Sequence, residues 1–530
     1  MLRLSLVILA LAGLLPVTAV AHAAPPAGFD RRVEQLRKAY GTPGVTIAIV
    51  ERGSPTLTKG WGVRQIGTSL SVDADTIFAT GSTGKAFTSA ALAILVDQGN
   101  IKWDDRVIDH MPDFRLWDPW VTREMTIRDL LVHRSGLGLG AGDLLFVPNS
   151  DLTRKETVRR LRYIKPATSF RSAYAYDNVL YMVAGQLIEE VSGQTWEQFV
   201  RQNIFARLGM KNSTVSDREL QSSSNRGRPH SRSDGPIVGM GTQALLDESA
   251  TLAANAAPAG GLAISANDMS RWLLTQLARG KIPGGDARLF SEAQSEEMWR
   301  PVILQPLSPL PPEFKATEPN FDTYALGWDV RDYRGGKLIW HGGAVFGSLA
   351  AVALLPDQEV GLYIAVNSEE GEIVRGLMYE LLDHYLGAPP GQWPEKLRAY
   401  KLARQTQVAK IVAAETAKPA PVGPSLSLER YTGDFTDSWY GTIKVRRSGD
   451  FLTIDFPHST GMDGRLTHHQ YDTFRTNPTQ RWIEPAYVTF ALDADGKVDR
   501  VTMKAVSPIA DFSFDYQDLL FTPANQAERR

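Results

Sequence analysis

The stretch TGSTGKA, residues 80–86, holds the residues on which the fold and the chemistry depend. It allows two interpretations. A phosphate-binding loop has the pattern G-x-x-x-x-G-K-[ST], and the stretch supplies its G-K pair. However, Ala79 and Ala86 stand where that pattern needs a glycine and a hydroxyl residue. The stretch also contains S-x-x-K, in which Ser82 precedes Lys85 by one helical turn. This second pattern is typical of a serine nucleophile and its basic partner.

The physical case for Ser82 rests on its place at the start of a predicted helix. The segment 82–99 has apolar residues at helical spacing and ends at a glycine. Backbone N–H groups and the helix dipole stabilise negative charge at such a start. Lys85 faces the same side, and burial would lower its pKa until it could accept the serine proton. The alternative is an ordinary N-cap serine followed by a solvated lysine.

A second motif, Y-x-N, is formed by Tyr176 and Asn178 at the start of another amphipathic helix, residues 179–190. In the ordinary interpretation the tyrosine packs its ring and the asparagine caps the helix. In the functional interpretation Tyr176 is a phenol or phenolate that relays the proton of Ser82. Asn178 then binds Lys85 and the substrate carbonyl.

A third motif lies in LIWHGGAVFGS, where His341, Gly342 and Gly343 end a predicted strand. The ordinary interpretation is a turn with a surface histidine. In the functional interpretation the glycines allow close approach of backbone and substrate, and the strand edge binds an extended acyl chain. The N–H of Ala344, together with that of Ser82, then forms an oxyanion hole.

The ordered set S-x-x-K, Y-x-N and H-x-G resembles the serine β-lactamase and penicillin-binding-protein superfamily. It is most similar to the class C β-lactamase-like branch, which includes esterases, D-peptidases and the linearised-microcystin peptidase. Esterase and peptidase members of that branch often have His-x-Gly where β-lactamases have Lys-Thr-Gly. Four further segments are similar to the same family: TIRDLLVHRSGL (126–137), FARLGM (205–210), AGGLAISANDMSRWL (259–273) and YALGWDV (324–330).

The resemblance covers about residues 29–390 and implies an α+β fold of the β-lactamase/transpeptidase type. In that fold an antiparallel sheet is flanked by helices and accompanied by an all-helical subdomain. We expect a hydrolase domain at 24–390, a helical linker at 391–427 and an all-β domain at 428–530. The last region contains hairpin patterns and resembles the small lipocalin-like barrel appended to some family members.

Composition narrows the function classes. A chain of 530 residues with 43% hydrophobic residues is long enough for two or three domains with sizeable cores. A net charge of −2 gives no indication of a nucleic-acid partner or a polybasic membrane patch. The absence of cysteine excludes disulfides, thiolate metal sites and a cysteine nucleophile.

The first residues have the features of a secretory signal peptide, residues 1–23. Arg3 precedes an apolar run at 4–15, and residues 21–23 form a small-x-small cleavage site. The run is too short for a membrane span, although an uncleaved anchor is the alternative. No later stretch is apolar enough to cross a bilayer. We therefore expect a periplasmic or secreted protein without a transmembrane segment after signal removal.

Competing catalytic patterns are absent from the sequence. There is no G-x-S-x-G elbow, no H-E-x-x-H metal motif and no G-x-G-x-x-G after a strand. The segment DADGK at 493–497 differs from a calcium loop because its glycine comes too early. We expect neither a metal nor an organic cofactor.

These features predict an exported serine hydrolase that forms an acyl-enzyme on Ser82. Lys85 and Tyr176 share the base role, and the sequence leaves open which of them takes the proton. His341 is a poorer carboxylate anchor than lysine, which favours small peptides or amides, including those with D- or unusual residues, over β-lactams. An esterase or weak β-lactamase of the same mechanism is the alternative.

Two alternatives from other classes stay open. One is a non-catalytic protein that binds peptidoglycan. The other is a carrier that holds an apolar ligand in the C-terminal domain. A further option is that this domain covers the cleft or forms a homo-oligomer, and either would narrow access to short peptides.

Overall fold

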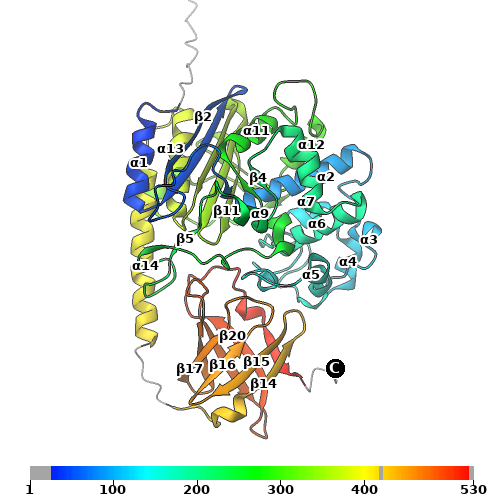
Figure 1. Cartoon of the computed structure of the whole chain (residues 1–530). Helices are drawn as coiled ribbons and strands as arrows, with labels where there is room; N and C mark the ends of the chain where they lie inside the picture. The colour runs from blue at the N-terminus through cyan, green and yellow to red at the C-terminus, as the bar shows by residue number, and fades with distance from the viewer. Residues whose placement is uncertain (1–24, 417–421, 525–530) are drawn as a thin grey trace, which may run out of the picture.

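The computed structural model describes residues 25–416 and 422–524. The predicted signal peptide, residues 1–23, lies outside the described residues. Figure 1 shows a larger N-terminal domain above a C-terminal barrel, with one long helix along the side of the N-terminal domain. Within the described part of the chain, no helix is long and apolar enough to cross a membrane.

The N-terminal domain is built on an eight-stranded antiparallel sheet with the order β2-β1-β13-β12-β11-β10-β9-β8. In that order the strands are Ser54–Gly62, Gly44–Glu51, Val360–Val366, Ser348–Leu355, Gly336–Val345, Asp329–Tyr333, Asp322–Tyr324 and Ile303–Leu304. Two small sheets are added, β3-β7-β4 (Phe78–Ala79, Ala263–Ile264, Ser213–Thr214) and β5-β6 (His230–Arg232, Gln243–Leu245).

Strand β1, the second in this order, is buried along its whole length, because helices cover both faces of the sheet. Its alternate residues Val45 and Ile47 pack with α1 (Phe29–Tyr40) and α13 (Gly371–Tyr385). The opposite face packs against α11 (Ala266–Leu277). Figure 1 shows α1 and α13 on one side of the sheet and the helical subdomain on the other.

The helical subdomain surrounds two apolar helices, α2 (Lys85–Asp97) and α6 (Val179–Ser192), which contact one another. Both are buried nearly all round, as expected for helices whose every face is apolar. The other helices are α3 (Val107–His110), α4 (Pro119–Glu124), α5 (Arg154–Arg160), α7 (Trp196–Val200), α8 (Ala206–Leu208), α9 (Asp217–Ser222), α10 (Ala257–Gly260) and α12 (Glu292–Met298).

The C-terminal domain is a closed barrel in which eight antiparallel strands follow each other in chain order. The strands β14 to β21 are Gly433–Asp437, Gly441–Ser448, Phe451–Asp455, Gly464–Gln470, Thr473–Pro478, Ala486–Leu492, Val498–Ala505 and Leu520–Pro523. Alternate residues point inwards, for example Ile443 and Val445, which are fully buried. This barrel and the sheet with its flanking helices confirm the predicted fold class.

The long helix α14 (Trp393–Thr416) connects the two domains along the chain. It packs against α13, and its first residue, Trp393, is buried and donates its indole N–H to Asp383 at 2.7 Å. Figure 1 shows α14 beside α1, and Arg32 of α1 forms an ion pair with Glu395 at 2.7 Å.

The β20–β21 connection of the barrel, residues 506–519, contacts the N-terminal domain. The carboxylate of Asp515 in this connection is buried and accepts hydrogen bonds from the N–H groups of Gly142, at 2.7 Å, and Leu144, at 3.2 Å. Arg160 of α5 donates a further bond, at 3.1 Å, to the carbonyl of Trp439 in the barrel. The barrel therefore abuts the helical subdomain next to the candidate site.

Candidate active site

Ser82 lies on a short turn between β3 and α2, in the 3-10 helix Gly81–Gly84. The α-helix begins three residues later than the serine, at Lys85. Gly81 has a φ of +53°. A Cβ atom on Gly343 of β11 would lie 1.9 Å from the carbonyl oxygen of Thr80. Glycine at position 343 therefore allows β11 to pack directly against the serine turn, a contact between two stretches of backbone.

Lys85 is fully buried, and its ammonium group contacts the serine. Its Nζ donates to Ser82 Oγ at 3.1 Å, to Asn178 Oδ1 at 2.7 Å and to the carbonyl of Ala259 at 3.0 Å. Burial lowers the pKa of Lys85 to about 7, against the opposing effect of the Asp143 and Asp177 carboxylates. A substantial fraction of this amine is therefore neutral near pH 7 and able to accept a proton.

Tyr176 completes the wall around the two groups. The Lys85 Nζ atom lies 4.8 Å from the centroid of the Tyr176 ring, and the centroids of the His133 and Tyr176 rings are 4.2 Å apart. Burial raises the pKa of Tyr176 well above its usual range, and a hydrogen bond with Ser82 partly offsets this rise. The phenol therefore keeps its proton at neutral pH.

A chain of hydrogen bonds joins the lysine to the barrel. Asn178 donates from Nδ2 to Asp143 Oδ2 at 2.9 Å, and Ser513 of the β20–β21 connection donates to the same oxygen at 2.8 Å. Burial raises the pKa of Asp143 to about 8. Its Oδ1 atom is buried and has no hydrogen-bond partner in the described part of the chain. Ser513 of the C-terminal domain thus contributes directly to the hydrogen bonds around the active-site lysine.

His341 lies on β11 and is buried. Its Nε2 atom is 2.8 Å from the hydroxyl of Tyr324, and its Nδ1 atom is 2.5 Å from the carbonyl oxygen of Gly342. Burial, together with the charge of Lys85, lowers the pKa of His341 to about 3. The imidazole is therefore neutral, and both of its nitrogens already have neighbours with which they interact.

The site residues predicted from the sequence lie around one cleft of about 770 Å³. Ser82, Tyr176, Asn178, His341, Gly342 and Ala344 line it. Lys85 lies beneath the surface and contacts Ser82, and Gly343 packs against the serine turn. The structure therefore brings all of the predicted residues together.

Among the buried groups that sequence reasoning missed are His133 and Asp177. His133 Nδ1 accepts the N–H of Asp177 at 3.1 Å and lies 3.3 Å from its carboxylate, while burial lowers the pKa of the ring. His133 supports the face of Tyr176. The segment 126–137 was recognised as similar to the family, and the histidine within it was the available signal.

The arrangement suits nucleophilic catalysis. A hydroxyl group contacts a buried amine of lowered pKa, and a protonated phenol lies beside both. This is the combination that acyl transfer to a serine needs. Among the described residues there is no group of three or more His, Asp or Glu side chains placed to hold a metal ion.

The fold and the contact between Ser82 and Lys85 define a serine hydrolase of the β-lactamase and penicillin-binding-protein type. Residues 29–385 match the Beta-lactamase family, and the chain belongs to this family. Residues 417–523 match a domain family of unknown function, DUF3471. The resemblance inferred from the three motifs is confirmed.

Several known proteins are similar to this chain. Unguisins hydrolase ungD' of Aspergillus campestris is 28% identical over 442 residues, which cover 79% of this chain and 77% of the relative. Penicillin-binding protein 4 of Amycolatopsis lactamdurans is 27% identical over 373 residues, covering 69% of this chain and 90% of the relative. The octameric penicillin-binding protein homologue from Pyrococcus abyssi shares the fold, with a TM-score of 0.57, 19% identity, and coverage of 93% of this chain and 99% of that one.

Proposed function

We propose that the protein is an exported serine hydrolase that cleaves peptide or amide bonds, including those of D- or unusual residues, through an acyl-enzyme. The observation that carries the proposal is the 3.1 Å contact between the buried amine of Lys85 and the hydroxyl of Ser82. A relative whose name describes a hydrolase of unguisins supports hydrolysis rather than binding alone.

In the proposed reaction Ser82 Oγ attacks the substrate carbonyl carbon and its proton passes to the neutral amine of Lys85. The lowered pKa of Lys85 and the raised pKa of Tyr176 support this assignment of the base. Tyr176 then donates its phenolic proton to the departing nitrogen and regains one from Lys85. Water attacks the ester on Ser82 by the reverse proton path and releases the acid.

The N–H groups of Ser82 and Ala344 are the proposed oxyanion donors. Their backbones are adjacent, since a Cβ on Gly81 would lie 2.5 Å from Ala344 N and a Cβ on Gly343 would lie 3.1 Å from Ser82 N. Losing one such donor lowers the rate roughly a hundredfold or more in serine hydrolases.

The neutral His341 supports the preference for peptides and amides over β-lactams. A ring whose pKa is lowered to about 3 carries no positive charge to bind a carboxylate. Tyr324 and the Gly342 carbonyl also occupy its nitrogens. Carboxylic esters that react by the same steps are the second candidate substrates.

Export is proposed from the first residues of the sequence, where Arg3 precedes the apolar run at 4–15. Expression in a Gram-negative host followed by fractionation tests it. The proposal requires mature protein in the periplasm or medium that begins after residue 23, as measured by intact mass.

The reaction is tested with a panel of nitrocefin, nitrophenyl esters, D- and L-aminoacyl nitroanilides and linear peptides. The wild type is expected to hydrolyse the amide or peptide substrates, and Ser82→Ala is expected to lose this activity. Full turnover by Ser82→Ala would refute the assignment. A covalent serine probe that failed to label Ser82 would instead favour a non-catalytic binding protein.

A further inference from the structure

The end of the cleft formed with the barrel differs in charge from the end that holds the serine. The carboxylates of Glu369, Glu484 and Asp511 line it. Glu369 follows β13 in the N-terminal domain. Glu484 and Asp511 belong to the barrel, in the β18–β19 loop and the β20–β21 connection. Two domains therefore contribute acidic groups to one region, which we call the acidic end.

The carboxylate of Glu484 is the unusual member. Glu484 is only 7% exposed, and among the described residues no hydrogen bond or ion pair of its side chain contributes to its pKa. Burial, with the nearby charges of Asp511 and Glu369, raises the pKa of Glu484 to about 7. A mostly buried carboxylate without a partner is destabilised in its charged form, and Glu484 lines the cleft, so a cation bound there would stabilise it.

The other two carboxylates do not supply that partner. Glu369 accepts hydrogen bonds from Ser231 Oγ at 2.6 Å and from the N–H of Gly347 at 3.2 Å. Asp511 accepts the N–H of Ser513 at 2.9 Å and is exposed. The hydrogen-bond donors of both carboxylates are neutral, and burial raises the pKa of Glu369 against the attraction of Lys401.

One cation, Lys401, also lines the cleft, but it forms ion pairs with two other carboxylates. Its Nζ lies 2.9 Å from Glu370 and 3.0 Å from Glu372. The acidic end therefore retains excess negative charge after this lysine has been counted.

Apolar groups shape the same end of the cleft. Trp482, two residues before Glu484, packs on Phe346 at the β11–β12 turn with ring centroids 4.4 Å apart. Phe512, next to Asp511, packs against the ring of Tyr176 at 6.0 Å. The acidic end is thus continuous with the wall of the reactive centre and lies within reach of a substrate bound at Ser82.

We propose that the acidic end is a substrate subsite, centred on Glu484 and built jointly by the two domains, that binds a positively charged amine or guanidinium group. The inference rests on the proposed function, because it names the class of peptide that the same cleft accepts. Such a cation is either the free α-ammonium group of a peptide or a basic side chain such as lysine.

The subsite is tested by binding to Ser82→Ala protein, which does not turn substrate over. The probes are acetylated tetra-alanine amides in which lysine or norleucine replaces each alanine in turn, together with the unacetylated tetra-alanine amide. Affinities are measured by calorimetry at pH 7.5. We expect at least one cationic peptide to bind tenfold or more tightly than its neutral partner. Tighter binding of a lysine peptide than of its norleucine partner would show that the subsite binds a basic side chain. Tighter binding of the unacetylated than of the acetylated tetra-alanine amide would show that it binds the α-ammonium group.

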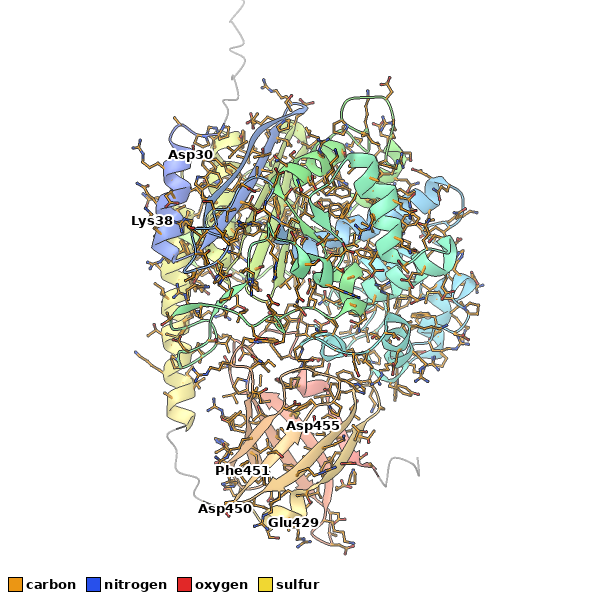
Figure 2. The ribbon with its side chains drawn as sticks, viewed as in Figure 1. Asp30, Lys38, Glu429, Asp450, Phe451 and Asp455 are labelled. Carbon is orange, nitrogen blue, oxygen red and sulfur yellow. The ribbon has the colours of Figure 1, made fainter. Side chains whose placement is uncertain are left out.

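A second substitution assigns the effect to the subsite. In Ser82→Ala/Glu484→Gln, the affinities for the cationic peptide and its neutral partner should differ by less than twofold. Thermal unfolding verifies that this variant is folded. The matched control is Glu429→Gln in the same background. Glu429 lies at the end of the barrel away from the N-terminal domain, as Figure 2 shows, and this variant should keep the preference.

Two results would overturn the subsite: no cationic peptide binds more tightly than its neutral partner, or the preference survives Glu484→Gln. These results are distinct from failure of the proposed function. If the function were wrong, wild-type protein would form no acyl-enzyme. If only the subsite were wrong, acylation of Ser82 would proceed with no preference for charge.

Discussion

Hydrolysis should depend on pH through Lys85, because only the neutral amine can take the proton of Ser82. Burial lowers the pKa of Lys85 from 10.5 to about 7. It raises the neutral fraction at pH 7 from about one in 3000 to about one half. The neutral form increases with pH, so kcat/KM should rise through an inflection near 7. At pH 5 it should be about fiftyfold lower than at pH 7.

Above the inflection near pH 7, kcat/KM should stay constant to at least pH 9. The pKa of Tyr176 is raised well above its usual range by burial, so the phenol stays protonated across this interval. The assay is the hydrolysis of one amide substrate under kcat/KM conditions in constant-ionic-strength buffers from pH 5 to 9.

Lys85→Arg tests the same point at fixed pH. The guanidinium group stays charged and cannot act as a base, so kcat should fall by a factor of about 100 to 10,000 without recovery at high pH. Lys401→Arg is the control, because this lysine lines the same cleft and serves as a cation bound to Glu370 and Glu372. It should retain the wild-type pH profile. A flat profile from pH 5 to 9, or near-normal activity of Lys85→Arg, would refute the reasoning.

Three further variants test other contacts of the site. Tyr176→Phe should lower kcat about a hundredfold or more with unchanged thermal unfolding, because the leaving group loses its proton donor; unchanged kcat would contradict this. Ser513→Ala removes a hydrogen bond that favours the charged form of Asp143, so the pKa of Asp143 should rise. A smaller negative charge on Asp143 then raises the pKa of Lys85 less. The kcat/KM inflection of this variant should therefore move to lower pH, and a move upwards would reverse the argument. Gly343→Ala should abolish activity, since its Cβ would lie 1.9 Å from a main-chain oxygen of the serine turn, whereas Gly342→Ala, with its nearest atom at 3.7 Å, should remain active. Equal activities of these two variants would exclude the packing argument.

The sequence was sufficient for the parts of the site that depend on local spacing. Ser82 and Lys85 are one helical turn apart, and their contact follows from that spacing. Asn178 precedes a strongly apolar helix, and the functional interpretation of the Y-x-N motif predicted its contact with Lys85, which the structure shows at 2.7 Å. The barrel was predictable because its hairpin turns and alternating residues are also local signals.

The parts that escaped prediction depend on tertiary contacts. Asp143 lies in a loop with no motif of its own, and Ser513, which bonds to it, is 370 residues away in the chain. His133 acquires its place beneath Tyr176 only when two loops pack together. Glu484 looks like any surface glutamate in the sequence, and only the apposition of the barrel and the N-terminal domain buries it. Motif spacing carries no information about such contacts.

The contribution of the C-terminal domain is likewise a matter of packing. A tail that resembles a lipocalin-like barrel suggests a ligand-binding module, an oligomer contact or a cover over the cleft. In the structure Ser513 bonds to Asp143 beside the lysine, and Asp515 bonds to the backbone of the helical subdomain. The barrel is therefore part of the wall of the cleft.

The central claim is that Ser82 is acylated during turnover. Intact-mass spectrometry of protein quenched in the first turnovers of a nitrophenyl ester or an activated amide tests it most directly. We expect an adduct with the mass of the acyl group, mapped by peptide digestion to the segment 80–86 and absent from Ser82→Ala. Turnover without any adduct, together with undiminished hydrolysis by Ser82→Ala, would contradict it.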